Sequence, residues 1–358
     1  MRQALLNMAF MWHSIDKDFS SRARLRNEEG DSVAYALTCA RSFGSSEPRD
    51  HIYGRLGLMQ CTWQGIPVSL QPNYQKPVED VFRDASWFSI REEGVDMIFP
   101  DVRHRSSEDL ERTDWKSWVP HWDVAWNENE DATELPWTRK CSGEPQVSLT
   151  ENNSLCIKGL LVDNIVAHTK ECLQRSWFSR SNETNADHIL NWLDEALDIV
   201  ERAAKTSART LSLQQSALQI LGSTLLANSS CVTSSGLEQF RSFLLRNRRV
   251  PDVFYPPDSI CSGGNGPSWK YQWAMRQHSQ NRRVFATASG HVGIGPKIME
   301  QADLVVAFTG ACKFYVLRRC GSRHRLVGEC YVYDCAPTDA FSGGVVGDEP
   351  ELQSFELV

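Results

Sequence analysis

The sequence predicts an α+β protein with mainly helical N-terminal and middle regions and a small C-terminal β-sheet or barrel. Two patterns support this prediction. Apolar residues recur at helical spacing in several segments before residue 248, whereas short β-branched and aromatic runs separated by glycine-bearing turns follow residue 282. Hydrophobic residues make up 41% and charged residues 23% of the chain, which is ordinary for a folded protein.

Two helices are expected in the first third of the chain. The first covers residues 46–57, because Pro48 fits a first helical turn and Gly57 suits a helix end. The second opens at Pro77, continues with apolar residues at helical spacing, and stops at Gly94.

The middle of the chain is expected to change from strands to helices. Short apolar runs at Ser154–Ile157 and Leu160–Val166 predict two strands. Three apolar stripes over residues 185–247 then predict helices. Residues 250–268 are rich in Pro, Gly and Ser and are typical of a linker.

Strands dominate the remainder of the chain. Five short runs carry the pattern: Arg283–Thr287, Val292–Ile294, Leu304–Phe308, Lys313–Arg318 and Arg325–Tyr333. Their rhythm is typical of a small, strongly bent sheet or barrel. The expected organisation is a helical, Trp-rich region (1–150), short strands then helices (151–249), a linker (250–268), a small β domain (269–341) and a loose tail (342–358).

Composition and charge exclude several function classes. The 38 basic and 45 acidic residues give a net charge of −7, which argues against a nucleic-acid partner. No apolar stretch approaches the roughly 20 residues of a membrane span. The 11 cysteines include no Cys-x-x-Cys pair, so we expect no metal site and reduced thiols in a cytoplasmic protein.

Two constellations resemble catalytic or cofactor sites only in part. Gly290–Pro296 lacks the Gly-Lys-Ser/Thr ending of a phosphate loop and opens into no helix, so its glycines indicate strand corners, and we expect no cofactor. His104, His121 and Asp123 offer acid–base groups, but they are most simply interpreted as solvated or aromatic-packed residues. No residue is therefore assigned a catalytic role.

Arg49 and Asp50, at the start of the first predicted helix, stand out among the polar residues. An arginine fork beside a helix-capping carboxylate can lock a loop or bind a partner's carboxylate in bidentate fashion. A short N-terminal helix with one apolar face also needs a cover. The candidate docking or structural-clamp residues are Phe10, Pro48, Arg49, Asp50, Tyr53, Trp118 and Trp122.

Several segments together resemble the fungal heterokaryon-incompatibility (HET) domain proteins. Residues 46–58 resemble that family's Thr-Asp-Pro-Arg-Asp-Lys-Ile-Tyr-Ala-Leu-Leu-Gly-Leu segment, and 72–82 resemble its Pro-Asp-Tyr, Lys-Pro and following helix. Ser117–Asp123 is similar to Ser-Trp-Val-Pro-Asp-Trp, with His121 in place of aspartate. Residues 290–332 are similar to the family's closing β segment, although Ala302 replaces a usual glycine.

The family's opening Tyr-x-Ala-Leu-Ser-Tyr-x-Trp-Gly motif, which marks the TIR-related HET domain proper, has no counterpart here. The resemblance therefore implies the region downstream of the HET domain, as a natural short form or a truncated gene model. It implies a non-enzymatic accessory or regulatory module of fungal nonself recognition and programmed cell death. The partner would be a HET effector domain or a second copy of the chain.

Two alternatives stay open. One is a hydrolase or nucleotide-cleaving enzyme that uses the loop His and Asp residues between His104 and Asp123. The other is an inactive truncated paralogue.

Overall fold

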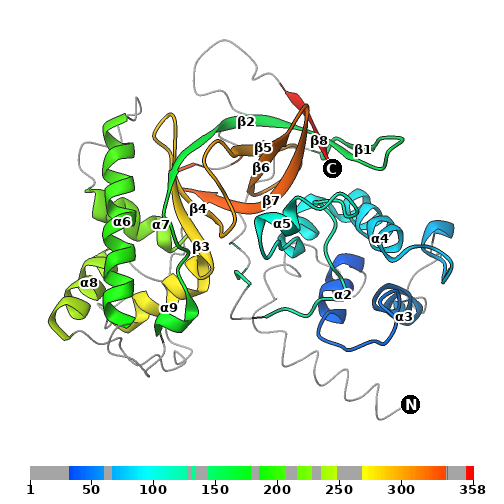
Figure 1. Cartoon of the computed structure of the whole chain (residues 1–358), viewed down its shortest axis with the longest axis horizontal. Helices are drawn as coiled ribbons and strands as arrows, with labels where there is room; N and C mark the ends of the chain where they lie inside the picture. Colours follow the sequence, from blue (N-terminus) through cyan, green and yellow to red (C-terminus); the bar gives the residue numbers. More distant parts are fainter. Residues whose placement is uncertain are drawn as a thin grey trace. The chain divides into compact units, whose positions relative to one another are not determined.

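The computed structural model describes residues 32–59, 67–127, 131–133, 135, 144–178, 185–206, 216–227, 235–247, 268–335, 337 and 352–358. The chain divides into two compact units (Figure 1). The first unit comprises residues 1–101 and 121–125, and the second comprises residues 102–120 and 126–358. The boundaries expected from the sequence stay predictions.

The first unit is helical. Its elements are α2 (Val33–Ala40), α3 (Asp50–Met59) and α4 (Val78–Glu93), with 3-10 turns at Val68–Leu70, Val95–Met97 and Phe99–Asp101. The carboxylate of Glu93 accepts hydrogen bonds from the amides of Val33 (2.8 Å) and Ala34 (3.1 Å), so the end of α4 caps the start of α2. The helices are therefore joined through polar contacts as well as through their buried faces.

The prediction for α4 is confirmed and that for α3 is corrected. Gly94 follows α4 with a φ of 95°, a conformation that favours glycine, and its amide bonds to the carbonyl of Ile90 at 2.9 Å. Helix α3 does not end at Gly57 but continues to Met59. Glycine inside a helix costs only about 1 kcal/mol relative to alanine, so it does not force a stop.

The second unit combines helices and strands. Its helices are α5 (Ser107–Leu110), α6 (Asn185–Thr206), α7 (Ala217–Leu225), α8 (Ser235–Asn247) and α9 (Ser268–Ser279), with a 3-10 turn at Arg175–Phe178. Its strands are β1 (Val147–Leu149), β2 (Leu155–His168), β3 (Arg282–Thr287), β4 (Val292–Pro296), β5 (Leu304–Phe308), β6 (Phe314–Cys320), β7 (Arg323–Val332) and β8 (Gln353–Leu357). These elements confirm the α+β class.

The strands of the second unit close on themselves. Among the described residues, the order is β1-β2-β3-β4-β7-β6-β5, and a further pairing of β2 with β5 completes the ring. Strand β2 pairs with β5 through Gly159–Asn164 and with β3 through Ile165–His168, with a register shift in each ladder. The strand therefore bends as it passes from one neighbour to the other.

Three features of the second unit differ from the sequence prediction. The two expected strands before residue 168 form one continuous strand, β2. Residues 268–279, placed mostly in the β domain, form helix α9. The expected loose tail ends in β8, which pairs antiparallel with β2 and contacts β7 in parallel register. Phe355 and Leu357 are buried there, which is why this segment is ordered.

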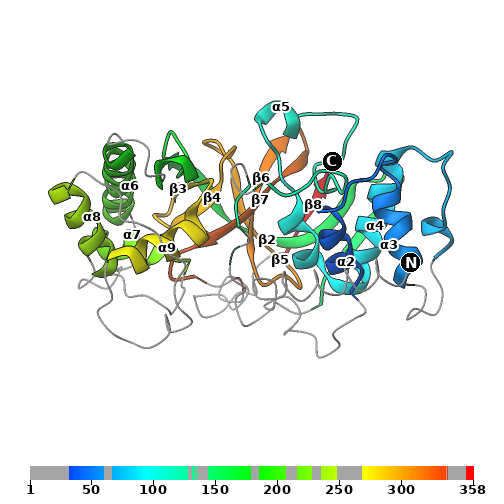
Figure 2. The same ribbon diagram turned by 90° about the horizontal axis from the view of Figure 1, so that it is seen from below.

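Helices α6 to α9 lie together beside β3 and β4 (Figure 1 and Figure 2). Val284 of β3 and Ile294 of β4 face this helical layer, whereas Phe285 faces the barrel interior. Gly293 lies against the Phe285 ring, and a Cβ at Gly293 would come within 2.5 Å of it. The glycines of Gly290–Pro296 therefore make room inside a barrel strand and do not form a phosphate loop.

Two further observations concern the cysteines and possible membrane spans. Cys312 is disulfide-bonded, which contradicts the expectation that the cysteines are reduced, because spacing along the chain does not reveal which thiols the fold brings together. No helix in the described part of the chain combines the length and the apolar character that a membrane span requires.

Candidate functional site

Side chains from the start of α3 fix the loop formed by residues 67–77, which we call the clamped loop. Arg49 Nε donates to the carbonyl of Lys76 at 2.7 Å, and Arg49 Nη1 bonds to Glu47 Oε1 at 2.6 Å. The hydroxyl of Tyr53 donates to the carbonyl of Asn73 at 3.1 Å. These contacts join α3 to two points of the loop and hold its backbone in one arrangement.

The clamped loop presents two apolar side chains to solvent. Tyr74 is 53% exposed and Val68 is 83% exposed. The Tyr74 hydroxyl donates to Asp50 Oδ1 at 2.6 Å, and its ring lies edge-to-face with Tyr53 at a centroid distance of 5.5 Å. The hydrogen bond with Asp50 raises the pKa of the Tyr74 phenol. An exposed ring is thus held in position by groups on α3.

The structure brings some of the predicted site residues together and separates others. Pro48 lies in the turn before α3, beside Arg49. Trp122 is buried in the first unit and its Nε1 donates to Ser86 Oγ of α4 at 3.1 Å. Trp118 is also buried but belongs to the second unit. Phe10 lies outside the described residues.

The histidines of the hydrolase alternative are not gathered within one unit. His104 belongs to the second unit, where its Nε2 donates to the carbonyl of Leu326 in β7 at 2.9 Å. His121 and Asp123 belong to the first unit. Within the described ranges, no three His, Cys, Asp or Glu side chains gather as a metal ion would require.

A charged cluster is buried where β3, β6 and β7 meet. Arg282 Nη2 bonds to Glu329 Oε1 at 2.6 Å, and Lys313 Nζ bonds to Glu329 Oε2 at 2.9 Å. The three side chains are only 3%, 2% and 7% exposed in the order Arg282, Lys313, Glu329. Arg282 also donates to the carbonyl of Thr133 at 2.8 Å, and Glu329 accepts from the amide of Leu135 at 2.8 Å. The cluster therefore holds the backbone of Thr133 and Leu135 against the barrel.

Sequence reasoning missed this cluster. Arg282 and Lys313 immediately precede or begin predicted strands, and Glu329 lies inside another, so each looks like an ordinary strand residue. The one available signal is a glutamate within an apolar run, since a carboxylate facing a core must find a partner. Its partners depend on strand register, which the sequence alone does not specify.

The cluster also affects His278, in the last turn of α9. Burial, reinforced by the nearby Arg282 charge, lowers the pKa of His278 to about 4. The unfolded chain holds this imidazole near its ordinary pKa of about 6.5. Below that pH the His278 imidazole is protonated in the unfolded state but stays neutral in the folded state. The free energy of unfolding therefore falls as the pH drops from about 6.5 towards 4.

His278→Leu is therefore expected to reduce the acid sensitivity of the fold. Between pH 7 and pH 5, the free energy of unfolding of the parent protein should fall by about 2 kcal/mol more than that of the variant. Urea unfolding at both pH values measures the difference. Leu245→Ala, at an exposed position of α8 with no titratable group, is the control and should lose as much stability between the two pH values as the parent. Equal losses for parent and His278→Leu would contradict the assignment.

Comparison with known proteins adds two findings. Residues 265–355 match the family model described as the Het-6 beta-barrel domain. The chain is also similar to the protein named "Heterokaryon incompatibility protein 6, OR allele" from Neurospora crassa, with 22% identity over 359 residues. That alignment covers 87% of this chain and 50% of the relative, so the chain spans about half the length of the curated relative. No solved structure matches.

Proposed function

We propose, from the premise that this chain is a fungal HET-related protein, that it acts in heterokaryon incompatibility as a non-enzymatic accessory or regulatory module. It would work in the cytoplasm through protein–protein contacts, with a HET effector domain as its partner. The clamped loop would be the docking face, and nonself recognition leading to cell death would be its setting.

The single observation that carries the proposal is the presentation of Tyr74 and Val68 on a fixed backbone. Protein interfaces depend on a few anchors, among which tyrosine is enriched. Binding also costs less when an anchor is already ordered before the partner arrives. Arg49, Asp50 and Tyr53 supply that order, because each bonds to the clamped loop or to Tyr74 itself.

Tyr74→Ala is expected to weaken binding to a HET-family partner about 30-fold, as removal of an anchor worth about 2 kcal/mol would do. The partner in the experiment is the full-length Neurospora crassa relative, immobilised for biolayer interferometry with the complete chain in solution. Tyr74→Phe keeps the ring but loses the bond to Asp50, so it should weaken binding less than Tyr74→Ala does.

Leu245→Ala is the matched control, because Leu245 is exposed on α8 in the other unit. It should change the dissociation constant less than about twofold, since isolated exposed apolar residues are common on protein surfaces. Thermal unfolding of each variant should match the parent. Absence of binding to the relative, or equal weakening by Tyr74→Ala and Leu245→Ala, would overturn the proposal.

A further inference from the structure

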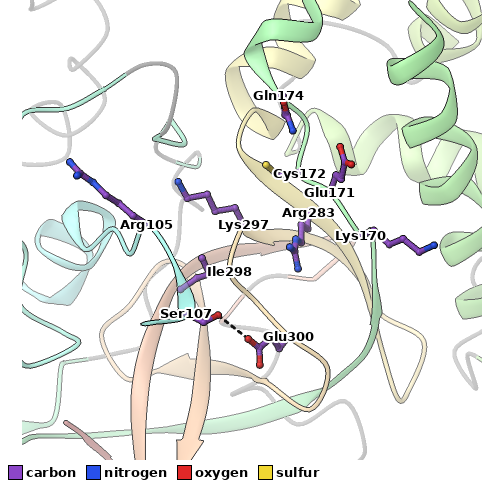
Figure 3. A pocket seen from close by; sticks show the side chains of 10 residues that line it. All are labelled: Arg105, Ser107, Lys170, Glu171, Cys172, Gln174, Arg283, Lys297, Ile298 and Glu300. Carbon is purple, nitrogen blue, oxygen red and sulfur yellow. Dashed lines mark hydrogen bonds between the residues drawn. The ribbon is translucent and has the colours of Figure 1, made fainter. Parts of the chain in front are cut away.

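An open pocket of about 370 Å³ lies within the second unit (Figure 3), whereas the clamped loop belongs to the first. Its walls come from four segments: the start of α5 with the residues before it, the segment after β2, strand β3 and the turn after β4. The described lining residues are Arg105, Ser107, Lys170, Glu171, Cys172, Gln174, Arg283, Lys297, Ile298 and Glu300. The volume lies within the range of about 300–1,000 Å³ that is typical of small-molecule sites.

Positive charge predominates in the pocket lining. The lining contains four basic side chains and two carboxylates, those of Glu171 and Glu300. The carboxylate of Glu300 is already engaged, because it accepts a hydrogen bond from Ser107 Oγ at 2.9 Å and pairs with Arg318 Nη1 at 3.0 Å. Arg318 also pairs with Asp303, so it does not cancel the charge of Glu300, and the lining holds four cations against two carboxylates. The field in the pocket is therefore suited to an anion.

Two of the cations, Lys297 and Arg283, lie in the middle of the lining, with their charged ends pointing in different directions. Figure 3 shows Lys297 and Arg283 in the middle of the labelled side chains, with Arg105 and Lys170 at opposite sides. Burial raises the pKa of the nearby Cys172 thiol, while the charges of Lys297 and Arg283 both lower it. Both positive charges thus act at the position of the Cys172 sulfur. In addition, Arg283 Nε is buried without a hydrogen-bond partner among the described residues.

The walls that carry these cations are held in place. Asp303 pairs with Arg318 through two contacts of 3.0 Å and accepts from the amide of Glu300 at 2.7 Å, which closes the turn after β4. Arg283 Nη1 donates to the carbonyl of Met299 at 3.1 Å in the same turn. On the opposite wall, Leu173 exchanges backbone hydrogen bonds with residues 281 and 282. Arg283 and the backbone that carries Lys297 are therefore positioned before any ligand arrives.

We propose that this pocket binds a small phosphorylated anion from solution. Guanidinium and ammonium groups are the side chains that proteins use for phosphate, and the amide nitrogen of Gln174 can donate a further hydrogen bond. Ile298 is the one hydrocarbon side chain among the ten lining residues, and none of the ten is aromatic, so they offer a nucleobase no stacking surface. The ligand class is accordingly a compact diphosphate or sugar phosphate.

The first test is titration calorimetry of the full chain with inorganic pyrophosphate. Binding to the parent protein is expected, and Lys297→Gln should weaken it about tenfold or more, as loss of one charge-assisted contact would do. Lys205→Gln removes an exposed cation at the end of α6 and is the control. It should change the affinity less than about twofold. Thermal unfolding of both variants should match that of the parent.

Alkylation of Cys172 by the neutral reagent iodoacetamide provides a second, site-specific measurement. Pyrophosphate should slow the reaction at Cys172 several-fold and leave Cys320, outside the pocket, unchanged. Lys297→Gln should abolish this protection at the same pyrophosphate concentration. The proposal would be overturned by absence of pyrophosphate binding, by equal weakening in both variants, or by binding without protection of Cys172. None of these outcomes supports or contradicts the proposal that the clamped loop binds a protein partner.

Discussion

Glu329→Ala is expected to lower the free energy of unfolding by about 3–5 kcal/mol, the cost of leaving buried charges without their partner. The substitution removes a carboxylate that contacts both Arg282 and Lys313, whose side chains are almost completely buried. It also removes the acceptor for the amide of Leu135. Urea unfolding measures the loss. Glu151→Ala, in the exposed turn before β2, should cost less than about 0.5 kcal/mol.

Lys313→Met tests the same explanation by removing one of the two cations that pair with Glu329. It leaves Arg282 and Glu329 as a balanced pair, so it should destabilise the fold much less than Glu329→Ala does. Burial opposes ionisation of Glu329, but the Lys313 and Arg282 charges outweigh it and lower the pKa of this carboxyl. Its stabilising contribution is therefore present at neutral pH and is lost as the pH falls through the folded-state pKa. Equal losses for the two variants would contradict this view.

Phe355→Ala is expected to lower the free energy of unfolding by about 3–5 kcal/mol, the usual cost of emptying a buried aromatic position. The Phe355 ring is buried between Phe308 of β5 and His324 of β7, at centroid distances of 5.9 and 5.3 Å. Strand β8 fills the space between β2 and β7, so loss of this ring should loosen the barrel at that point.

Leu352→Ala is the matched control, because Leu352 directly precedes β8 and is exposed. It should cost less than about 0.5 kcal/mol in the same urea titration. If Phe355→Ala were equally mild, β8 would contribute little to the barrel, and its ordered appearance would not reflect a stabilising strand.

The sequence predicted the helices and strands of this protein better than it predicted which strands pair and which side chains meet. The five C-terminal strands were visible because their apolar runs are bounded by glycine-bearing turns. Strand β8 was missed because it is short and half polar, although Phe355 and Leu357 alternate with Ser354 and Glu356 as a half-buried strand requires. The alternation could have been recognised, but five residues carry too little signal against an acidic, glycine-rich approach.

Of the two candidate sites, the sequence indicated the clamped loop but not the pocket. The importance of Arg49, Asp50 and Tyr53 could be anticipated, because they begin a helix and their first contacts lie on a nearby loop. The pocket around Lys297 and Arg283 could not, since its walls come from four segments spread between residues 105 and 300. Only the closure of the barrel brings such segments together, and closure depends on register and bending that composition does not encode.

The place of α6 to α9 in the connectivity has a consequence for the order of folding. The pairing of β2 with β3 closes a loop that contains all four helices, so this ladder joins residues far apart in the chain. Local helical contacts form quickly, whereas distant strand pairings are slow because the loop must be ordered first. Docking of the helices on β3 and β4 would shorten the loop that must be ordered before β2 and β3 pair. We therefore expect the helical layer to form early in the folding of the second unit, and barrel closure to be its slow step.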